Sequence, residues 1–593
     1  MAEAARSFLI VPAAGAGAGM GHLARCLRLA RALPSRVTFL STRMDSAARA
    51  LLAQEIRRFP GRPRPGALAR LPAGARYDLV IVDARQTTKE ELEDLLPHGP
   101  VVCLDEGGEA AAFAPFLVDT IPGLPGKRKA NLASLAYLEM PRRARRIVHA
   151  PIRTVIVSFG GEDRDGLSEM MLDALDRAGL FPPGATTVVE GPLFTPRRWP
   201  RGVRVLKNAS SLARHLAAHD LLITHFGITA FEALACGVPV ILFNPTRYHE
   251  KLGTAAGFAS VGTGAPRVAR LRRLLVDAGR LKAQVDDFNE LIGRSRTGRL
   301  ASLLAALALR GSPTCPVCGR SGNRVIARLP DRTYRRCARC HTVALESFAA
   351  RPKRYGKEYF SREYKAQYGR TYLQDFESIR TSSGSRVSLL RGLLGPDVRG
   401  TVVDVGCAYG PFLAALKDAG LPAFGVDVSP GAVSWVRGKL GIPAVCAAFE
   451  TMGRSSLPRP IAAVTMWYVL EHFTNTGLVL RKASSLLPIG GVLAFSTPNG
   501  RGLSARRSLA AFLRKSPADH FTIFSPRGLG WLLGEYGLAL RRVRVTGHHP
   551  ERFPGVLGRA ATRCRPVHGA LLLLSRIMGL GDTFEAYAVK EQL

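Results

Sequence analysis

Residues 402–410 read Val-Val-Asp-Val-Gly-Cys-Ala-Tyr-Gly, an apolar run followed by a turn that begins and ends with glycine. The run predicts a strand over Thr401–Val405, and the apolar segment after the turn predicts a helix from Pro411 to Ala419. Small residues in such a turn let a ligand approach the backbone, and the amino terminus of the helix stands opposite that ligand. The stretch therefore predicts a Rossmann-like α/β unit with a pocket at the turn.

Landmarks farther along the chain narrow the kind of pocket. The predicted strand Ala423–Asp427 ends in an acid about twenty residues after the turn, where a carboxylate holds ribose hydroxyls. Glu471-His472, Gly490-Gly491 and the segment Phe495 to Asn499 follow. In this order and spacing, the region from Arg399 to Tyr587 resembles class I S-adenosylmethionine (SAM)-dependent methyltransferases. A dinucleotide site is the alternative, but the Glu-His and Gly-Gly landmarks do not belong to it.

The methyltransferase resemblance implies contacts for the cofactor, SAM. It implies a methionine and sulfonium site at Asp404, Gly406 and Gly410, a ribose ligand at Asp427, and an adenine border at Phe449 and Glu450. The chain departs from the family pattern at Ala408, where the family has its middle glycine. We expect the extra methyl group to be tolerated there.

Two histidines are candidate catalytic residues. Methyl transfer from a sulfonium is an in-line displacement, so the protein aligns the acceptor and removes a proton when the acceptor is a hydroxyl. A histidine has a suitable pKa for that step. His472 follows the fourth strand at the acceptor rim, and His520 lies in a loop expected to close over the site. The alternative is that either histidine only caps or orients its loop.

Four cysteines predict a metal site. Cys315 and Cys318, then eighteen residues, then Cys337 and Cys340 have the spacing of a tetrahedral structural zinc site. His341 is adjacent but superfluous as a ligand, and reactive or merely buried thiols are the alternative. A cysteine ribbon before such a methyltransferase resembles sugar methyltransferases of glycan and antibiotic pathways. Some ribosomal RNA methyltransferases also carry a zinc module, so RNA stays open as a substrate.

The first half of the chain alternates short apolar strands with amphipathic helices, which predicts two doubly wound lobes. The Arg/Pro-rich stretch from Met140 to Pro151 marks the boundary between them, and an Arg-rich helical segment from Val268 to Arg310 closes the second lobe. The predicted strands are Phe8–Val11, Val37–Leu40, Leu79–Val82, Val101–Leu104, Thr154–Ser158, Thr187–Glu190, Leu221–Thr224 and Val240–Phe243.

A glycine turn with a histidine, residues 17–26, enters a helix directly after the first strand. This Gly-x-Gly-His-x-x-Arg-Cys pattern closely resembles GT-B nucleotide-sugar enzymes, above all the UDP-sugar hydrolases of pseudaminic acid biosynthesis. The resemblance continues through residues 78–83, 104–105 and 157–163 and covers about 260 residues. If this half is an active enzyme, His22 is the candidate base, which would activate water in a hydrolase or an acceptor hydroxyl in a transferase. We interpret Asp83 and Asp105 as structural acids at strand ends.

The resemblance also implies a nucleotide-sugar site. A glycine-bearing turn at a helix amino terminus suits a pyrophosphate, because unpaired N–H groups and the helix dipole face the anion. The residues assigned to the nucleotide sugar are Gly19, Gly21, Gly227, Thr229 and Glu232, with Glu232 on the uridine ribose. The chain departs from the family at residues 224–227 and 248–250, where the sugar lies. A purely structural helix start is the alternative.

Length and composition bound these interpretations. At roughly 100–200 residues per domain, 593 residues predict three to five globular units. The net charge of +37 is spread along the chain, which indicates a coding bias towards arginine or a preference for anionic ligands. Besides the two Cys-x-x-Cys pairs, the other six of the ten cysteines have no framework spacing, which suits a reducing cytosol. The apolar start at Ser7 resembles a signal peptide, but only Arg6 precedes it as a basic residue, so we predict a first strand and a cytoplasmic protein.

The sequence therefore predicts an α/β protein with a GT-B-like pair of Rossmann-type lobes, a four-cysteine zinc ribbon and a class I methyltransferase domain. The expected ranges are 1–145 and 146–311 for the lobes, 312–345 for the ribbon, 346–398 for connector helices and 399–593 for the methyltransferase. We expect a bifunctional sugar-modifying enzyme acting on a nucleotide sugar or glycan. An RNA methyltransferase and a methyltransferase with a non-catalytic scaffold are the alternatives. Peripheral membrane association stays open, and we do not expect a nucleic-acid partner.

Overall fold

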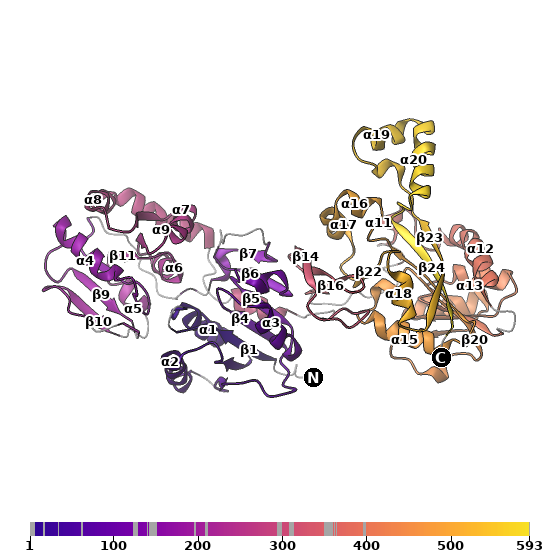
Figure 1. Ribbon diagram of the computed structural model, residues 1–593, viewed down its shortest axis with the longest axis horizontal. Coiled ribbons are helices and arrows are strands. Elements are labelled where there is room, and N and C mark those ends of the chain that lie inside the picture. Colours follow the sequence, from indigo (N-terminus) through magenta and orange to yellow (C-terminus); the bar gives the residue numbers. More distant parts are fainter. Residues whose placement is uncertain are drawn as a thin grey trace. The chain divides into compact units, whose positions relative to one another are not determined.

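The structure is a computed structural model that divides into two compact units, Met1–Leu307 and Ala308–Leu593 (Figure 1). It describes residues 6–591 apart from 16–17, 34, 61–62, 122–128, 139, 141–150, 192, 195–196, 208–211, 293–298, 308–313, 349–359, 361, 363 and 395–398. The domain boundaries predicted near 145, 311 and 398 lie outside the described residues. Within the described part of the chain, no helix has the length and apolar character needed to span a bilayer.

The first lobe of unit 1 is built on a parallel sheet of order β3-β2-β1-β4-β5-β6-β7. Its four predicted strands are confirmed, with ends that differ by at most one residue. The strands are β1 (Ser7–Pro12), β2 (Arg36–Leu40), β3 (Gly66–Leu68), β4 (Leu79–Asp83), β5 (Val101–Leu104), β6 (Phe116–Asp119) and β7 (Leu132–Ala133). The helices are α1 (Gly21–Ala32), α2 (Ser46–Arg57) and α3 (Lys89–Leu95), with a 3-10 turn η3 (Leu135–Tyr137).

The second lobe has a parallel sheet of order β10-β9-β8-β11-β12-β13. Alternate residues of its strands face two different cores, so both faces are buried and the central strands read as continuous apolar runs. The strands are β8 (Val155–Val157), β9 (Thr186–Glu190), β10 (Arg204–Lys207), β11 (Leu221–Thr224), β12 (Val240–Asn244) and β13 (Ala259–Thr263). The helices are α4 (Leu167–Ala178), α5 (Leu212–Leu216), α6 (Ile228–Ala235), α7 (Arg247–Ala255), α8 (Val268–Val276), α9 (Ala278–Ile292) and α10 (Arg299–Ala306).

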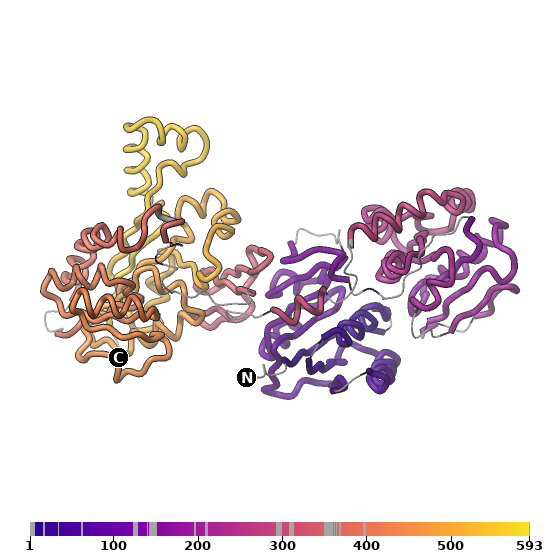
Figure 2. Tube along the Cα trace, turned by 180° about the vertical axis from the view of Figure 1, so that it is seen from behind, coloured from indigo at the N-terminus to yellow at the C-terminus, as the bar shows by residue number. Residues whose placement is uncertain are grey.

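The last helix of unit 1 corrects one prediction. The segment 268–310 was expected to close the second lobe, and α8 packs there against α4. Helix α10 instead returns to the first lobe, where it contacts α1 and η3 (Figure 2). Arg6, just before β1, donates hydrogen bonds from its guanidinium to the carbonyls of Ala305 and Leu307. The end of unit 1 therefore ties the two lobes together.

Unit 2 contains a seven-stranded sheet of order β19-β18-β17-β20-β21-β24-β23. Strands β17–β21 are parallel, whereas β24 runs antiparallel to both of its neighbours. The strands are β17 (Thr401–Val405), β18 (Ala423–Asp427), β19 (Ala444–Cys446), β20 (Ile461–Trp467), β21 (Val492–Pro498), β23 (Leu538–Thr546) and β24 (Thr583–Lys590). The helices are α11 (Tyr364–Tyr368), α12 (Phe376–Leu393), α13 (Pro411–Asp418), α14 (Pro430–Trp435), α15 (Thr476–Leu486), α16 (Leu503–Arg507), α17 (Leu509–Lys515), α18 (Leu529–Gly534), α19 (Gly555–Arg563) and α20 (Arg565–Ile577).

The cysteine-bearing segment is part of unit 2 and not a separate body. Its antiparallel strands are β14 (Arg324–Leu329), β15 (Arg332–Arg336) and β16 (Val343–Ser347), and β16 runs two residues beyond the expected end at 345. The fourth strand of this sheet, β22 (Thr522–Ile523), comes from the loop after α17. The ribbon therefore shares a sheet with the loop that carries His520.

Candidate functional site

The glycine turn of unit 2 lies at the carboxyl ends of the parallel strands. Gly406 and Gly410 both have positive φ angles, of +70° and +77°. A Cβ atom at position 406 would lie 2.3 Å from Cγ2 of Val469, so only glycine fits where the turn passes the loop after β20. Ala408 also lies in the left-handed region, with φ +49°, which costs roughly 1–2 kcal/mol for a residue with a Cβ. The turn therefore depends on glycine both for its backbone conformation and for its close packing against Val469.

Two buried acids flank this turn. The carboxylate of Asp427, at the end of β18, accepts hydrogen bonds from the backbone N–H groups of Ala408 and Ser429, both at 2.8 Å. Burial raises the pKa of Asp427. Asp404, on β17, accepts a hydrogen bond of 2.6 Å from the hydroxyl of Thr465, and burial raises its pKa to about 7. Through these hydrogen bonds Asp427 links the loop after β17 to the loop after β18, at the position expected for a ribose ligand.

The adenine-side candidates differ from each other in exposure. Phe449 is buried in the core beneath the sheet, and Glu450 beside it is exposed. The ammonium group of Lys482 lies 5.1 Å from the Phe449 ring centroid and donates a hydrogen bond of 2.6 Å to the Phe449 carbonyl. Both residues follow β19, the third strand of the site, so they lie at the same edge of the sheet as Asp427.

An aromatic cluster packs against the glycine turn, and sequence reasoning missed it. The Phe360 ring lies 5.0 Å from Tyr409 and 5.5 Å from Tyr372 between centroids, and Tyr409 lies 5.7 Å from Trp435. Phe360 forms a small core with Ala408. The signal was present, because five tyrosines occur between 355 and 372 in the segment interpreted as a connector. That segment therefore contributes one wall of the site.

Glu471, His472 and His520 come together at the carboxyl end of β20. Their ligand atoms all lie within 4.8 Å of one another, and the two imidazole rings are 4.7 Å apart between centroids. His472 donates from Nδ1 to the carbonyl of Asp519 at 3.2 Å, which makes Nε2 the basic nitrogen of the neutral ring. Glu471 is 1% exposed, and neither carboxylate oxygen has a hydrogen-bond partner among the described residues. This arrangement has the chemistry of a general base with a neighbouring acid, and also of a divalent-cation ligand set.

Glu471→Gln is expected to remove part of the pH dependence of unit 2 stability. Burial, only partly offset by the charge of His472, raises the pKa of Glu471 from 4.5 to about 7. The folded state therefore keeps this proton at a pH where the unfolded state has lost it, and the resulting stabilisation fades as the pH rises from about 4.5 to about 7. The unfolding free energy of the wild type should fall over this interval, and that of the variant should fall by on the order of 2 kcal/mol less.

The measurement is denaturant unfolding followed by tryptophan fluorescence, because Trp435, Trp467 and Trp531 all lie in unit 2. Glu377→Gln serves as the matched control, since that side chain is 73% exposed. Equal pH slopes for the wild type and Glu471→Gln would show that the buried carboxyl is not the titrating group.

The four cysteines lie in two similar tight turns. The N–H of Gly319 donates to the Cys315 carbonyl at 3.0 Å, and the N–H of His341 donates to the Cys337 carbonyl at 3.1 Å. All four Sγ atoms lie within 4.8 Å of one another, close to the separation of about 3.8 Å that thiolates have around a tetrahedral zinc ion. His341 continues its turn in the left-handed region, with φ +57°. The donor set therefore fits a four-coordinate metal ion, and His341 shapes the turn.

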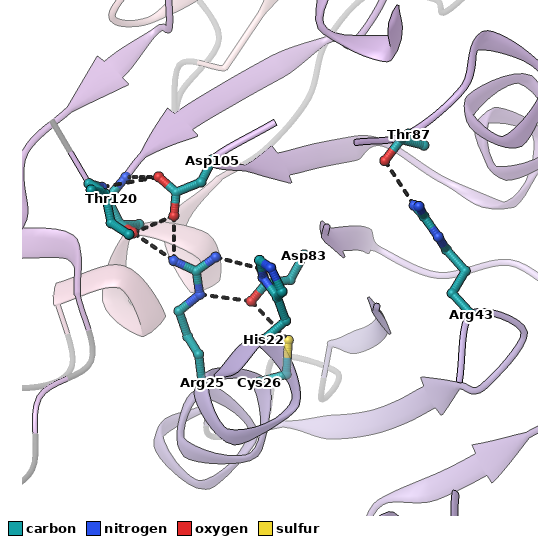
Figure 3. Close-up of polar contacts among 9 residues, drawn as sticks. His22, Arg25, Cys26, Arg43, Asp83, Thr87, Asp105 and Thr120 are labelled. Atoms are coloured by element: carbon teal, nitrogen blue, oxygen red, sulfur yellow. Dashed lines mark hydrogen bonds and ion pairs between the residues drawn. The ribbon is translucent and has the colours of Figure 1, made fainter. Parts of the chain in front are cut away.

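In unit 1, His22 at the start of α1 pairs with Asp83 at the end of β4 (Figure 3). The distance from His22 Nδ1 to Asp83 Oδ1 is 2.7 Å. Arg25 also donates to Asp83, through Nε at 2.8 Å, and to Asp105. Burial opposes ionisation of Asp83, but the charges of Arg25 and His22 outweigh it and hold the pKa of Asp83 below its usual range. Asp83 thus contacts the candidate base directly, which its interpretation as a structural acid did not include, whereas Asp105 contacts Arg25 and Thr120.

The other candidate residues of unit 1 lie around the amino termini of α1 and α6. Gly19, at φ +71°, and Gly21 lead into α1, and a Cβ at Gly21 would lie 3.8 Å from Cδ1 of Ile228, the first residue of α6. Gly227 precedes α6 and Thr229 lies in its first turn. The Glu232 carboxylate forms an ion pair of 2.6 Å with Arg28 of α1. The structure thus brings the two helix starts together, with Glu232 held by an arginine of the opposite lobe.

Comparisons with known proteins found similarity to methyltransferases in unit 2. Residues 382–543 match a family of methyltransferase domains. The chain is 27% identical over 166 residues to the ubiquinone biosynthesis O-methyltransferase of Chromobacterium violaceum, covering 25% of this chain and 68% of that protein. It is 30% identical over 131 residues to the protein of the same name from Methylococcus capsulatus, covering 21% of this chain and about half of that protein, 52%. A SAM-dependent methyltransferase structure from Archaeoglobus fulgidus is 18% identical, covers 38% of this chain and 98% of its own, and has a TM-score of 0.28.

Unit 2 therefore contains a class I SAM-dependent methyltransferase domain. The family match spans the glycine turn at 406–410, Asp427 and the Glu471-His472 pair. The prediction made from these residues is confirmed at the level of the domain and its reaction class.

Proposed function

We propose that the chain is a bifunctional enzyme of surface-glycan or sugar-nucleotide biosynthesis. Unit 1 cleaves or transfers a nucleotide-activated sugar, and unit 2 methylates a hydroxyl of a related sugar. The observation that carries this proposal is the His22–Asp83 pair, because it stands at a helix start that faces a second helix start in unit 1. Tethering two such sites raises the effective concentration of one near the other.

The fold of unit 1 supports a GT-B assignment. Each lobe has a parallel sheet with the doubly wound order 3-2-1-4-5-6, to which the first lobe adds β7 at the edge, and such sheets bind ligands beyond the carboxyl ends of their strands. The amino termini of α1 and α6 carry positive partial charge and lie close together, which favours a diphosphate between them. Arg28 holds Glu232 beside this position, where the carboxylate would meet the uridine ribose.

His22 would act as the general base of unit 1. Asp83 accepts a hydrogen bond from the Nδ1–H group of His22. The other ring nitrogen, Nε2, would therefore take a proton from water in a hydrolase or from an acceptor hydroxyl in a transferase. Arg25 anchors Asp83 from the other side, which fixes the orientation of the carboxylate and therefore of the imidazole. His22 is 19% exposed, so a substrate can reach it.

His22→Ala is expected to lower turnover of the nucleotide sugar by about 10²–10⁴-fold, the usual contribution of a general base. Methyl transfer by unit 2 should stay unchanged in the same preparation. UDP release is the measurement. His98→Ala is the control, because His98 precedes β5, at the amino end of the same sheet, where its Nδ1 lies 2.8 Å from the Ala75 carbonyl oxygen. Unchanged UDP release in His22→Ala would favour a non-catalytic scaffold.

In unit 2, bound SAM would supply an electrophilic methyl group on its sulfonium. Gly406 and Gly410 let the turn adopt its left-handed conformation against Val469 and Val436, the methionine end would lie along this turn, and Asp427 would accept the ribose hydroxyls. His472 would remove the proton of the acceptor through Nε2, and Glu471 next to it stabilises the imidazolium that forms. His520 closes the opposite side of the same cluster. Two relatives with O-methyltransferase in their names support oxygen as the methylated atom.

The metal at Cys315, Cys318, Cys337 and Cys340 is proposed to be zinc with a structural role. Four thiolates around a tetrahedral ion leave no open position for a substrate. The ribbon instead supports the methyltransferase through β22, which precedes α18 and follows His520.

The acceptor class is tested by incubating the protein with methyl-labelled SAM and separate panels of nucleotide sugars, glycans and RNA. Label in the sugar products, on an oxygen of the sugar ring as located by mass spectrometry, is the expected result. Label in RNA, with binding that weakens steeply as salt rises, would replace the sugar proposal with an RNA methyltransferase.

A further inference from the structure

A helical hairpin interrupts the carboxyl-terminal end of the methyltransferase sheet. Helices α19 and α20 lie between β23 and β24, and both views show them standing away from the sheet (Figures 1 and 2). Their inner faces form a small core of their own, with Phe553, Ala561 and Leu571 packed on Leu503 of α16. The hairpin is therefore an ordered projection with a defined inside and outside.

The outside of the hairpin is apolar. Six of the sixteen exposed large apolar side chains in the described part of the protein belong to it. They are Val556 at 70% exposure, Leu557 at 53%, Leu573 at 60%, Leu574 at 42%, Ile577 at 76% and Met578 at 54%. On α20, Leu573 and Ile577 lie one turn apart on the helical face opposite the buried Leu571 and Ser575, and Leu574 lies beside that face. Such a concentration marks an interaction surface.

The charge of the hairpin is of one sign. From Arg552 to Gly581 the chain has five arginines and no aspartate or glutamate. All five are exposed, and Arg552 among them pairs with Asp582. Apolar side chains alternating with arginine on a short, non-spanning helix pair are typical of segments that lie in the interface of an anionic bilayer.

The hairpin also lies at the functional edge of the sheet. Thr583, where β24 begins, pairs with Pro498 at the carboxyl end of β21 and with Thr546 at the end of β23. The carboxyl ends of the parallel strands carry Asp427 and the Glu471–His472 pair. A surface bound by the hairpin would thus face the edge at which the acceptor enters.

We propose that the α19–α20 hairpin docks the protein onto an anionic membrane surface. Leu573, Ile577 and their apolar neighbours enter the headgroup region, and the arginines pair with lipid phosphates. This docking is independent of whether the acceptor is a sugar, because it rests on the hairpin alone.

The test is co-sedimentation of the full-length protein with vesicles of phosphatidylglycerol and phosphatidylcholine, compared with phosphatidylcholine alone. The wild type should bind the anionic vesicles, and Leu573→Ser/Ile577→Ser should bind them about 10- to 100-fold more weakly because two exposed apolar anchors are lost. Arg559→Gln/Arg563→Gln should reduce the preference for anionic over neutral vesicles. Ile489→Ser is the control, since Ile489 is 58% exposed but precedes the amino end of β21, at the opposite edge.

If the net charge of +37 of the whole chain, and not the hairpin, attracted the protein to anionic vesicles, the co-sedimentation result would differ. In that case Leu573→Ser/Ile577→Ser and Ile489→Ser would both bind like the wild type, and the proposal would be overturned. It would also be overturned if the double variant kept full vesicle binding while converting a wild-type dimer into a monomer in sedimentation equilibrium, since the apolar face would then be covered by a second copy of the chain.

Discussion

Exchanging Asp427 for asparagine is expected to weaken SAM binding by about 10- to 100-fold, or about 1.5–3 kcal/mol. The carboxylate is 7% exposed and already accepts two backbone hydrogen bonds, from Ala408 and Ser429. An ionised carboxylate has lone pairs left for two ribose hydroxyls, whereas an amide offers one oxygen and replaces the other acceptor with a donor. Isothermal titration calorimetry of the full-length protein measures the loss.

Asp418→Asn is the matched control for this variant. Asp418 ends α13 in the same domain, its side chain is 51% exposed, and its partner is Arg380 on the surface. Circular dichroism of both variants checks that the fold is kept. An affinity for Asp427→Asn within twofold of the wild type would mean that the ribose is held elsewhere.

Cys337→Ser is expected to abolish binding of the proposed zinc ion and to lower the melting temperature of unit 2 by about 10 °C or more. The effect should be large because Cys315, Cys337 and Cys340 belong to the same buried cluster as core residues of the methyltransferase sheet. The connection is also polar, since the N–H of Gly477 on α15 donates to the Pro316 carbonyl at 2.7 Å. Loss of the ribbon geometry therefore reaches the domain that binds SAM.

Metal content and thermal unfolding test this prediction together. The wild type should contain one equivalent of zinc, and Cys337→Ser should contain almost none. Cys446→Ser and Cys564→Ser are the controls, because both cysteines are exposed and lie outside the cluster. A wild-type protein that is free of metal yet fully stable would rule out the structural zinc site.

The central strands were predictable because both of their faces are buried. Strands β5, β11, β17 and β18 have the bounds that their apolar runs indicated. The edge strand β10 was not predicted, since three of its four residues are exposed and it reads Arg-Val-Leu-Lys. The packing of α10 against the first lobe was also not predictable, because an amphipathic pattern does not indicate which lobe covers the apolar face of a helix.

The parts of the candidate site that a local motif defines could be predicted from the sequence. The contacts between segments far apart in the sequence could not. The glycine turn and Asp427 follow from local spacing, and the positive φ angles explain why glycine stands at 406 and 410. The contact of Asp83 with His22 joins residues 61 positions apart, and no periodicity indicates it. Phe360 reaches the turn from a segment whose composition alone suggested a linker.

Calorimetric titration of the purified wild-type chain with SAM tests the central claim, a cofactor pocket around the turn at 406–410, most directly. The structure predicts saturable binding of one equivalent per chain. A titration without saturable binding, in protein that retains its metal and its folded circular dichroism spectrum, would contradict it.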